Sequence, residues 1–193
     1  MPQLLHLMAS PRGEASESRQ AARQWARSWL QAGADHALRE RDLYQPLLPH
    51  PDAGFAEASL LTDGLREDRH QSALALSETL IAELDGADAL LVSSPLHNFM
   101  VPSAFKAWID LVLRPRRTFS ITPQGKTGLL RDRPVRLVLS SGGRLGEGPG
   151  GQPDFVTPYL RQVFATLGLR DLQIELLPDR NRRHAAALNA RPG

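Results

Sequence analysis

Short apolar runs alternate with amphipathic helical stretches along the whole chain of 193 residues. This alternation indicates βαβ units, because a strand that is followed by a helix returns over the sheet to a parallel strand. The runs that predict strands cover residues 4–8, 37–43, 88–95, 136–141 and 172–177. We therefore expect a three-layer α/β domain whose mainly parallel sheet is covered on both faces.

The segments between these strands predict helices over residues 18–32, 68–84, 102–113 and 153–167. Residues 45–54, which contain prolines and a glycine, predict a connection without regular structure. The length suits one globular domain, so we expect residues 1–193 to form a single domain.

Composition excludes several kinds of chemistry. The chain has no cysteine, which excludes disulfides, thiolate metal clusters and a cysteine nucleophile. Its six histidines lack the spacing of a zinc-binding helix, so no metal site is expected. No apolar run approaches the roughly 20 residues that span a bilayer, and the first ten residues do not resemble a secretory signal. We expect a cytoplasmic protein that does not contact a membrane.

The charge balance does not indicate nucleic-acid binding. The 23 basic and 21 acidic residues leave a net charge of +2. The densest basic cluster has no interleaved aromatic residues, and it consists of Arg180, Arg182 and Arg183. We expect no nucleic-acid partner.

The segment after the first strand has the features of a phosphate site. Ligands of parallel sheets bind beyond the carboxyl ends of the strands. Ser10, Ser16 and Ser18 lie at the entrance to the first long helix, where hydroxyls and unpaired N–H groups favour an anion. Two glutamates in this segment oppose an anion unless they point outward, and Arg12 offsets them. The alternative is that Ser16 or Ser18 only caps the helix.

The segment after the third strand, residues 94–102, is bounded by prolines that restrict its backbone. Its aromatic ring, amide and backbone groups suit a flat heteroaromatic ligand, with Asn98 and Phe99 at the edge of the sheet. The alternative is an ordinary turn. His97 has a side chain suited to proton transfer near neutral pH, although an isolated histidine is more often a surface residue.

The segment after the fourth strand begins with Ser140 and Ser141 and holds six glycines before Gln152. Glycines allow backbone N–H groups to approach a ligand closely, and a loop of this kind also suits a lid. A flexible surface loop without function has the same composition.

Together, the three segments resemble the flavodoxin-like FMN-dependent NADH:quinone oxidoreductases, the bacterial azoreductase family. The most specific stretch is residues 94–112 (SPLHNFMVPSAFKAWIDLV), which is similar to the family pattern P-M-Y/W-N-F-x-x-P-x-x-L-K-x-x-x-D. Residues 156–160 (VTPYL), residues 167–168 and residues 118–119, the last with a hairpin-like excursion through Gly125, also resemble the family. The chain departs from the family at Leu96, where methionine is usual, at His97, where tyrosine or tryptophan is usual, and at Glu17, where glutamine is frequent.

The resemblance implies a flavodoxin-like three-layer sandwich with strand order 2-1-3-4-5, and a homodimer in which Phe119 and neighbouring arginines reach across to the partner. It implies FMN as cofactor, NADH or NADPH as electron donor, and two-step transfer through the flavin to a quinone or azo compound. It implies catalytic roles for His97 and Asn98. The implied contacts of FMN are Ser10, Ser16, Glu17 and Ser18 for the phosphate, and Pro95, Leu96, His97, Asn98, Phe99, Ser140, Ser141, Gly142 and Gly143 for the ring.

Three alternatives stay open at this stage. One is a quinone reductase of the same fold that uses FAD, and a second is a flavodoxin-like module that binds a ligand or carries electrons without catalysis. Low-potential electron carriers of this fold tend to be acidic, which the isoelectric point of about 9.5 disfavours. The third is a chain that has kept the fold and lost the cofactor.

Overall fold

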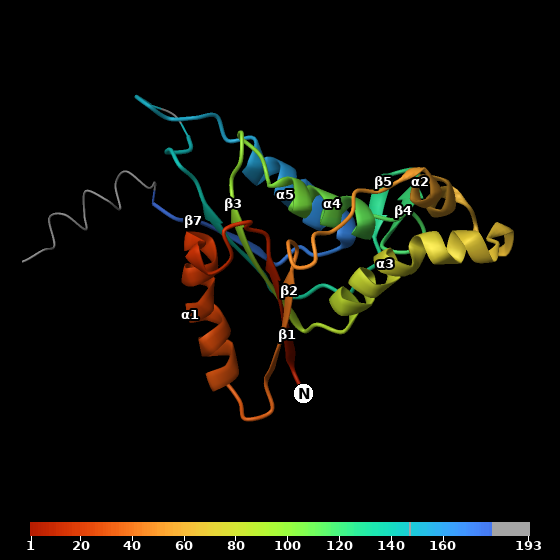
Figure 1. Cartoon of the computed structure of the whole chain (residues 1–193), viewed down its shortest axis with the longest axis horizontal. Helices are drawn as coiled ribbons and strands as arrows, with labels where there is room; N and C mark the ends of the chain where they lie inside the picture. Colours follow the sequence, from red (N-terminus) through yellow and green to blue (C-terminus); the bar gives the residue numbers. More distant parts are fainter. Residues whose placement is uncertain (147, 179–193) are drawn as a thin grey trace, which may run out of the picture.

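The computed structural model describes residues 1–146 and 148–178. A sheet of five parallel strands occupies its centre (Figure 1), as the apolar runs predict. Its strands are β1 (Gln3–Met8), β2 (Ala37–Asp42), β3 (Ala89–Pro95), β6 (Val135–Ser140) and β7 (Leu172–Leu176). The arginine cluster of the sequence analysis, Arg180, Arg182 and Arg183, lies outside the described residues.

The strands of this sheet are ordered β2-β1-β3-β6-β7. The numbering differs from the expected 2-1-3-4-5 because two further strands precede the fourth strand of the sheet. These are β4 (Phe119–Thr122) and β5 (Gly125–Gly128), which pair with each other as an antiparallel hairpin outside the main sheet. The hairpin-like excursion implied by the family resemblance is therefore present.

The helices match the predicted ones to within a few residues, with one addition. They are α1 (Glu17–Gln31), α3 (Asp68–Asp85), α4 (Ser103–Val112) and α5 (Val156–Leu167), with short 3-10 turns at Gly13–Ala15 and Asp63–Leu65. Helix α2 (Ala53–Leu60) was not predicted. Its first turn is stabilised by Asp52, whose carboxylate accepts the Phe55 N–H at 2.8 Å. Among the described residues, no helix is both long enough and apolar enough to cross a membrane.

The sheet is covered on both faces, which gives the predicted three layers. Because side chains alternate along a strand, Leu5 and Leu7 of β1 enter the larger core, formed with α3, α4 and α5. Leu4 points to the opposite face and packs with Ala22 and Ala26 of α1 in a smaller core. Figure 1 shows α1 on one side of the sheet and the other long helices on the opposite side.

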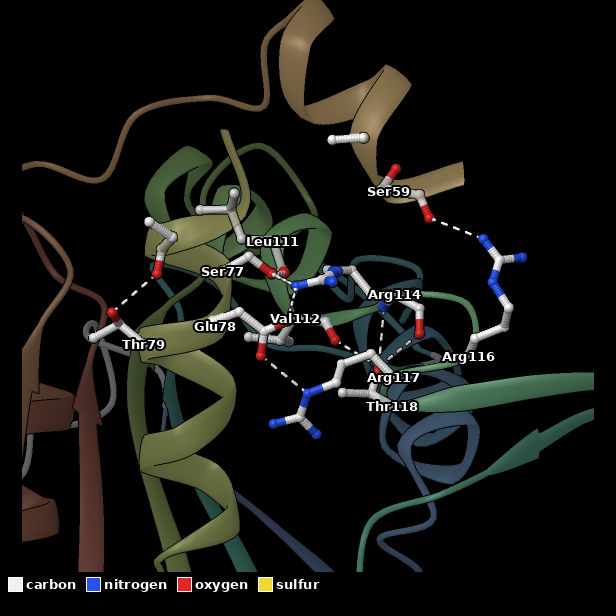
Figure 2. Close-up of polar contacts among 12 residues, drawn as sticks. Ser59, Ser77, Glu78, Thr79, Leu111, Val112, Arg114, Arg116, Arg117 and Thr118 are labelled. Atoms are coloured by element: carbon white, nitrogen blue, oxygen red, sulfur yellow. Dashed lines mark hydrogen bonds and ion pairs between the residues drawn. The ribbon is translucent and has the colours of Figure 1, made fainter. Parts of the chain in front are cut away.

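A buried arginine holds the base of the β4–β5 hairpin against α3 (Figure 2). The guanidinium of Arg114 donates hydrogen bonds to Ser77 Oγ at 3.1 Å and to Glu78 Oε1 at 2.7 Å, while its backbone N–H donates to Thr118 Oγ1 at 2.9 Å. Thr118 in turn donates to the Val112 carbonyl at the end of α4. The side chain of Arg114 is 1% exposed, so these bonds compensate much of the cost of burying its charge.

The side chains next to this arginine also contact their own chain. Arg116 donates to the carbonyls of Leu60 and Leu61 at the end of α2. Figure 2 shows its contact with the neighbouring Ser59 carbonyl and the pairing of Arg117 with Glu78. Phe119 is buried. The expected contact of Phe119 and neighbouring arginines with a partner subunit stays a prediction.

A buried histidine lies on the α1 side of the sheet. His6 Nε2 is 3.0 Å from Ser93 Oγ, and its Nδ1 is 3.7 Å from Glu40 Oε1. Burial, together with the positive charges of Arg19 and Arg23 on α1, lowers the pKa of His6 from 6.5 to about 4. His6 is therefore neutral in the folded protein at neutral pH.

This pKa predicts acid sensitivity of the fold. Between pH 6.5 and about 4, His6 binds a proton in the unfolded chain and not in the folded one, so stability falls as the pH falls through this window. A shift of this size corresponds to about 3 kcal/mol, and we expect a loss of about 2 kcal/mol between pH 7 and 4.5. Urea unfolding of the wild type and of His6→Gln at pH 7 and at pH 4.5 measures this loss in the free energy of unfolding. An equal loss in the variant would assign the effect to other groups.

Candidate functional site

The three segments singled out in the sequence meet at one edge of the sheet. The Ala9 N–H donates to the Ser93 carbonyl at 2.9 Å, which joins the ends of β1 and β3. The Leu96 N–H donates to the Ser140 carbonyl at 2.7 Å, which joins the ends of β3 and β6. The parallel register thus places the loops after β1, β3 and β6 beside one another, as expected for a ligand site of an α/β sheet.

The serines after β1 are all buried. Ser16 caps α1, since its Oγ accepts the Arg19 N–H at 3.3 Å, and the same oxygen lies 3.1 Å from Ser18 Oγ. The capping role considered in the sequence analysis is therefore real for Ser16. Ser10, Ser16 and Ser18 are at most 2% exposed, so an anion reaches their hydroxyls only when the segment between Ser10 and Ser16 shifts. Gly13 in that segment has φ +50°, a left-handed conformation that glycine adopts without strain.

The two glutamates near these serines are Glu14, which is paired with arginines of α1, and Glu17, which lies in the first turn of that helix. Glu14 forms ion pairs with Arg23 and, at 3.6 Å, with Arg19, which also pairs with Asp42 at 2.7 Å. Glu17 is the first residue of α1, where its charge interacts favourably with the helix dipole. The charge of Glu14 is thus balanced within the chain.

A tight turn follows β3. The N–H of His97 donates to the Met100 carbonyl at 2.8 Å, and the N–H of Met100 donates to the His97 carbonyl at 3.0 Å. The two central residues, Asn98 and Phe99, have φ angles of +48° and +70°, as in a type I′ turn. A left-handed conformation disfavours a bulky residue by about 1–2 kcal/mol, so Phe99 is held there by the surrounding bonds. Strain of this kind is frequent at ligand sites.

The glycine-rich loop after β6 closes on itself. The Gln152 N–H donates to the Arg144 carbonyl and the Gly146 N–H donates to the Gln152 carbonyl, both at 2.9 Å. A Cβ atom on Gly151 would lie 2.0 Å from the Gly146 carbonyl oxygen, so only glycine fits at this crossing. The described part of this segment is therefore an organised loop and not an extended surface strand.

The turn and the glycine-rich loop enclose a cavity of about 260 Å³, lined by Leu96, Asn98, Phe99, Ser141, Gly142, Gly143, Leu145 and Gln152. Six of these residues were predicted to contact the ligand. The other predicted residues do not line the cavity, and they are Pro95, His97, Ser140 and the four phosphate-site residues Ser10, Ser16, Glu17 and Ser18. Leu145 and Gln152 were missed. These two residues pair with each other and join the two ends of the loop. The sequence does not show this pairing, because the glycines between them allow many backbone conformations.

The chain is similar to known proteins over most of its length. A family model described as the flavodoxin-like fold matches residues 2–191. The FMN-dependent NADH:quinone oxidoreductase 2 of Cupriavidus pinatubonensis is 50% identical over 175 residues, which cover 90% of this chain and 84% of that protein. The FMN-dependent NADH:quinone oxidoreductase 5 of Burkholderia lata is 47% identical over 168 residues, covering 87% of this chain and 80% of that protein.

Solved structures agree on the fold. The azoreductase from Bacillus anthracis strain Sterne has a TM-score of 0.86 at 23% identity and covers 98% of this chain and 92% of its own. An FMN-dependent NADH-azoreductase from the Ames Ancestor strain of that species, solved in complex with FMN, has a TM-score of 0.81, also at 23% identity, and covers 99% and 100%. The chain therefore belongs to the flavodoxin-like family and, within it, to the FMN-dependent NADH:quinone oxidoreductases.

Proposed function

We propose that this protein is an FMN-dependent NADH:acceptor oxidoreductase that reduces quinones and azo compounds. The observation that carries the proposal is the strained Asn98–Phe99 turn facing Gly142 and Gly143 across a cavity, at the carboxyl edge of a flavodoxin-like sheet. The relatives named above at 47–50% identity support the same activity.

The cavity fits a flat, polar-edged ring such as the isoalloxazine of FMN. A Cβ atom on Gly142 would meet nothing within 4 Å, so space is open beside the backbone there. At Gly143, a Cβ atom would lie 2.9 Å from the side-chain amide nitrogen of Gln152, so glycine avoids a close contact there. Leu96 and Phe99 supply apolar surface at the opposite wall. The ring contacts in this proposal are Pro95, Leu96, His97, Asn98, Phe99, Ser140, Ser141, Gly142 and Gly143.

When bound, FMN supplies the redox chemistry by accepting a hydride from NADH and passing electrons to the acceptor. The protein's part is to orient the rings and to offer N–H donors where negative charge develops. The N–H groups of Leu96 and His97 already donate to the carbonyls of Ser140 and Met100. The backbone N–H groups that we assign to this role are therefore those of Asn98, Phe99, Gly142 and Gly143, with the Asn98 side-chain amide beside them. His97 is exposed and its backbone closes the turn, so we assign its imidazole at most the delivery of a proton to the acceptor.

The phosphate site in this proposal consists of Ser10, Ser16, Glu17 and Ser18, at the N-terminus of α1. Serine hydroxyls and helix N–H groups suit a phosphate. The ion pairs of Glu14 with Arg23 and Arg19 support it, because they balance a carboxylate that would otherwise repel the anion.

We further propose that residues 1–193 form a single domain and that two copies of the chain form a homodimer. The proposed location of this dimer is the cytoplasm. Light scattering of the purified protein tests the dimer. NADH is the donor that the names of the relatives support, and steady-state assays with NADH and NADPH in parallel test that preference.

Replacing Asn98 with alanine is expected to lower the rate of quinone reduction about tenfold, which corresponds to roughly 1.4 kcal/mol of lost transition-state stabilisation. Alanine removes the amide and also fits the φ of +48° less well than asparagine. Asn98→Gly separates the two causes, because glycine keeps the turn and loses only the amide. Steady-state rates equal to those of the wild type in both variants would contradict the assignment.

The activity itself is tested by NADH oxidation in the presence of a quinone, with FMN, FAD or no flavin added to flavin-stripped protein. We expect activity that depends on FMN. Restoration by FAD alone would favour the FAD-using alternative, and flavin binding without NADH oxidation would favour the non-enzymatic module.

A further inference from the structure

Two half-exposed phenylalanine rings contact each other at the rim of the cavity. Phe99 is 50% exposed and Phe155 is 56% exposed. Their ring centroids lie 6.5 Å apart with the ring planes at 83°, an edge-to-face pair. Phe99 lines the cavity and Phe155 does not, so Phe155 extends the apolar surface outward by one ring.

Both rings are fixed by their backbones. Phe99 is a central residue of the turn that the His97 and Met100 hydrogen bonds close. Phe155 directly precedes α5, where the Asp154 carboxylate accepts the Thr157 N–H at 2.9 Å. An aromatic side chain on an ordered backbone has few rotatable bonds, so it loses little conformational entropy when a ligand covers it.

We propose that Phe155, together with Phe99, forms a subsite for the second aromatic ring of a two-ring acceptor, such as a naphthoquinone or a diaryl azo compound. This proposal rests on the function proposed above. With the flavin ring in the cavity, an acceptor reacts at the cavity mouth, and its second ring continues over the adjoining surface of Phe155. A one-ring benzoquinone ends before that surface, so Phe155 discriminates between acceptors by size.

The position of the Phe99–Phe155 pair beside the cavity indicates that a ring of the acceptor covers it. The pair is continuous with the cavity wall, and exposed aromatic surface beside a cavity is typical of a ligand-binding region. Neither ring carries a charge, which suits the apolar second ring of such an acceptor. Phe155 is thus a specificity-determining residue, distinct from the residues proposed to hold FMN.

The test is the ratio of kcat/KM for a naphthoquinone to kcat/KM for a benzoquinone, measured on FMN-loaded protein. In Phe155→Ala we expect this ratio to fall about fivefold, in line with the strength of a single aromatic contact. Phe155→Tyr keeps the ring and is expected to restore the ratio. Leu65→Ala, which truncates an exposed apolar side chain on the 3-10 turn after α2, is the matched control and should leave the ratio unchanged.

The possible failures are distinguishable. If the wild type binds FMN and reduces neither quinone, the proposed function fails. If it reduces both and the ratio is the same in Phe155→Ala, only the subsite is wrong. Light scattering and FMN affinity are measured on each variant, and loss of a dimer in Phe155→Ala would overturn the subsite in favour of an interface between two copies of the chain.

Discussion

Replacing Ser10, Ser16 and Ser18 together with alanine is expected to weaken FMN binding about 100-fold. Each hydroxyl that bonds a charged group contributes about 1.5–3 kcal/mol, and the three are not additive because Ser16 and Ser18 already bond each other. Titration of flavin fluorescence against the flavin-stripped protein measures the dissociation constant.

Riboflavin separates a phosphate effect from a structural one, because it has the same ring and no phosphate. We expect its affinity to change little in the triple variant. Loss of the Ser16 cap alone destabilises α1 by about 1 kcal/mol, so circular dichroism must show that the variant is folded. Ser28→Ala, which changes an exposed serine of the same helix, is the control. Equal losses for FMN and riboflavin, or no loss for FMN, would contradict the phosphate assignment.

Replacing Gly128 with alanine is expected to lower the free energy of unfolding by about 3 kcal/mol, at the upper end of overpacking effects. Gly128 ends β5 and packs directly on the C-terminal end of α5. A Cβ atom there would lie 2.1 Å from Gly168 N and 2.4 Å from the carbonyl carbon of Leu167. These are backbone atoms that no side-chain rotation can move aside. Urea denaturation followed by circular dichroism measures the loss.

Gly64→Ala is the matched control for this change. Gly64 lies in a 3-10 turn, and a Cβ atom there would meet nothing within 4 Å, so we expect a change within about 0.5 kcal/mol. If Gly128→Ala is as stable as this control, the close contact between β5 and the end of α5 does not exist in solution.

The central strands could be predicted from the sequence because burial on both faces leaves a continuous apolar run. Leu90, Leu91 and Val92 are all buried, although successive side chains face opposite helical layers. Helix α2 lacked any such pattern. Its eight residues follow a proline-rich connection, and the capping bond of Asp52, which defines its start, is visible only in three dimensions.

The location of the site could be predicted from the sequence, whereas some of the residues that line the cavity could not. Chain order and the position of each loop after a strand were enough to bring Asn98 and Phe99 close to Gly142 and Gly143. The sequence did not reveal how the glycine-rich loop closes, because glycines accept many backbone conformations and hide which residues pair. Leu145 and Gln152 were missed for this reason.

The contacts of the arginines beside Phe119 within the chain could not be predicted from the sequence, and their contact with a partner subunit stays a prediction. The arginines beside Phe119 stand near the hairpin in sequence, yet Arg114 and Arg117 are bound to Glu78 on α3. This single acidic partner lies 36 residues from Arg114 and 39 residues from Arg117 along the chain, and no local sequence pattern reveals such a distant contact.

The most direct test of the account is the visible spectrum of the FMN-loaded protein, recorded anaerobically before and after NADH is added and again after a quinone is added. We expect the flavin absorbance to bleach with NADH and to recover with the quinone, with one quinone consumed for each NADH. A protein that binds no flavin even when FMN is supplied, or whose bound flavin does not respond to NADH, would contradict it.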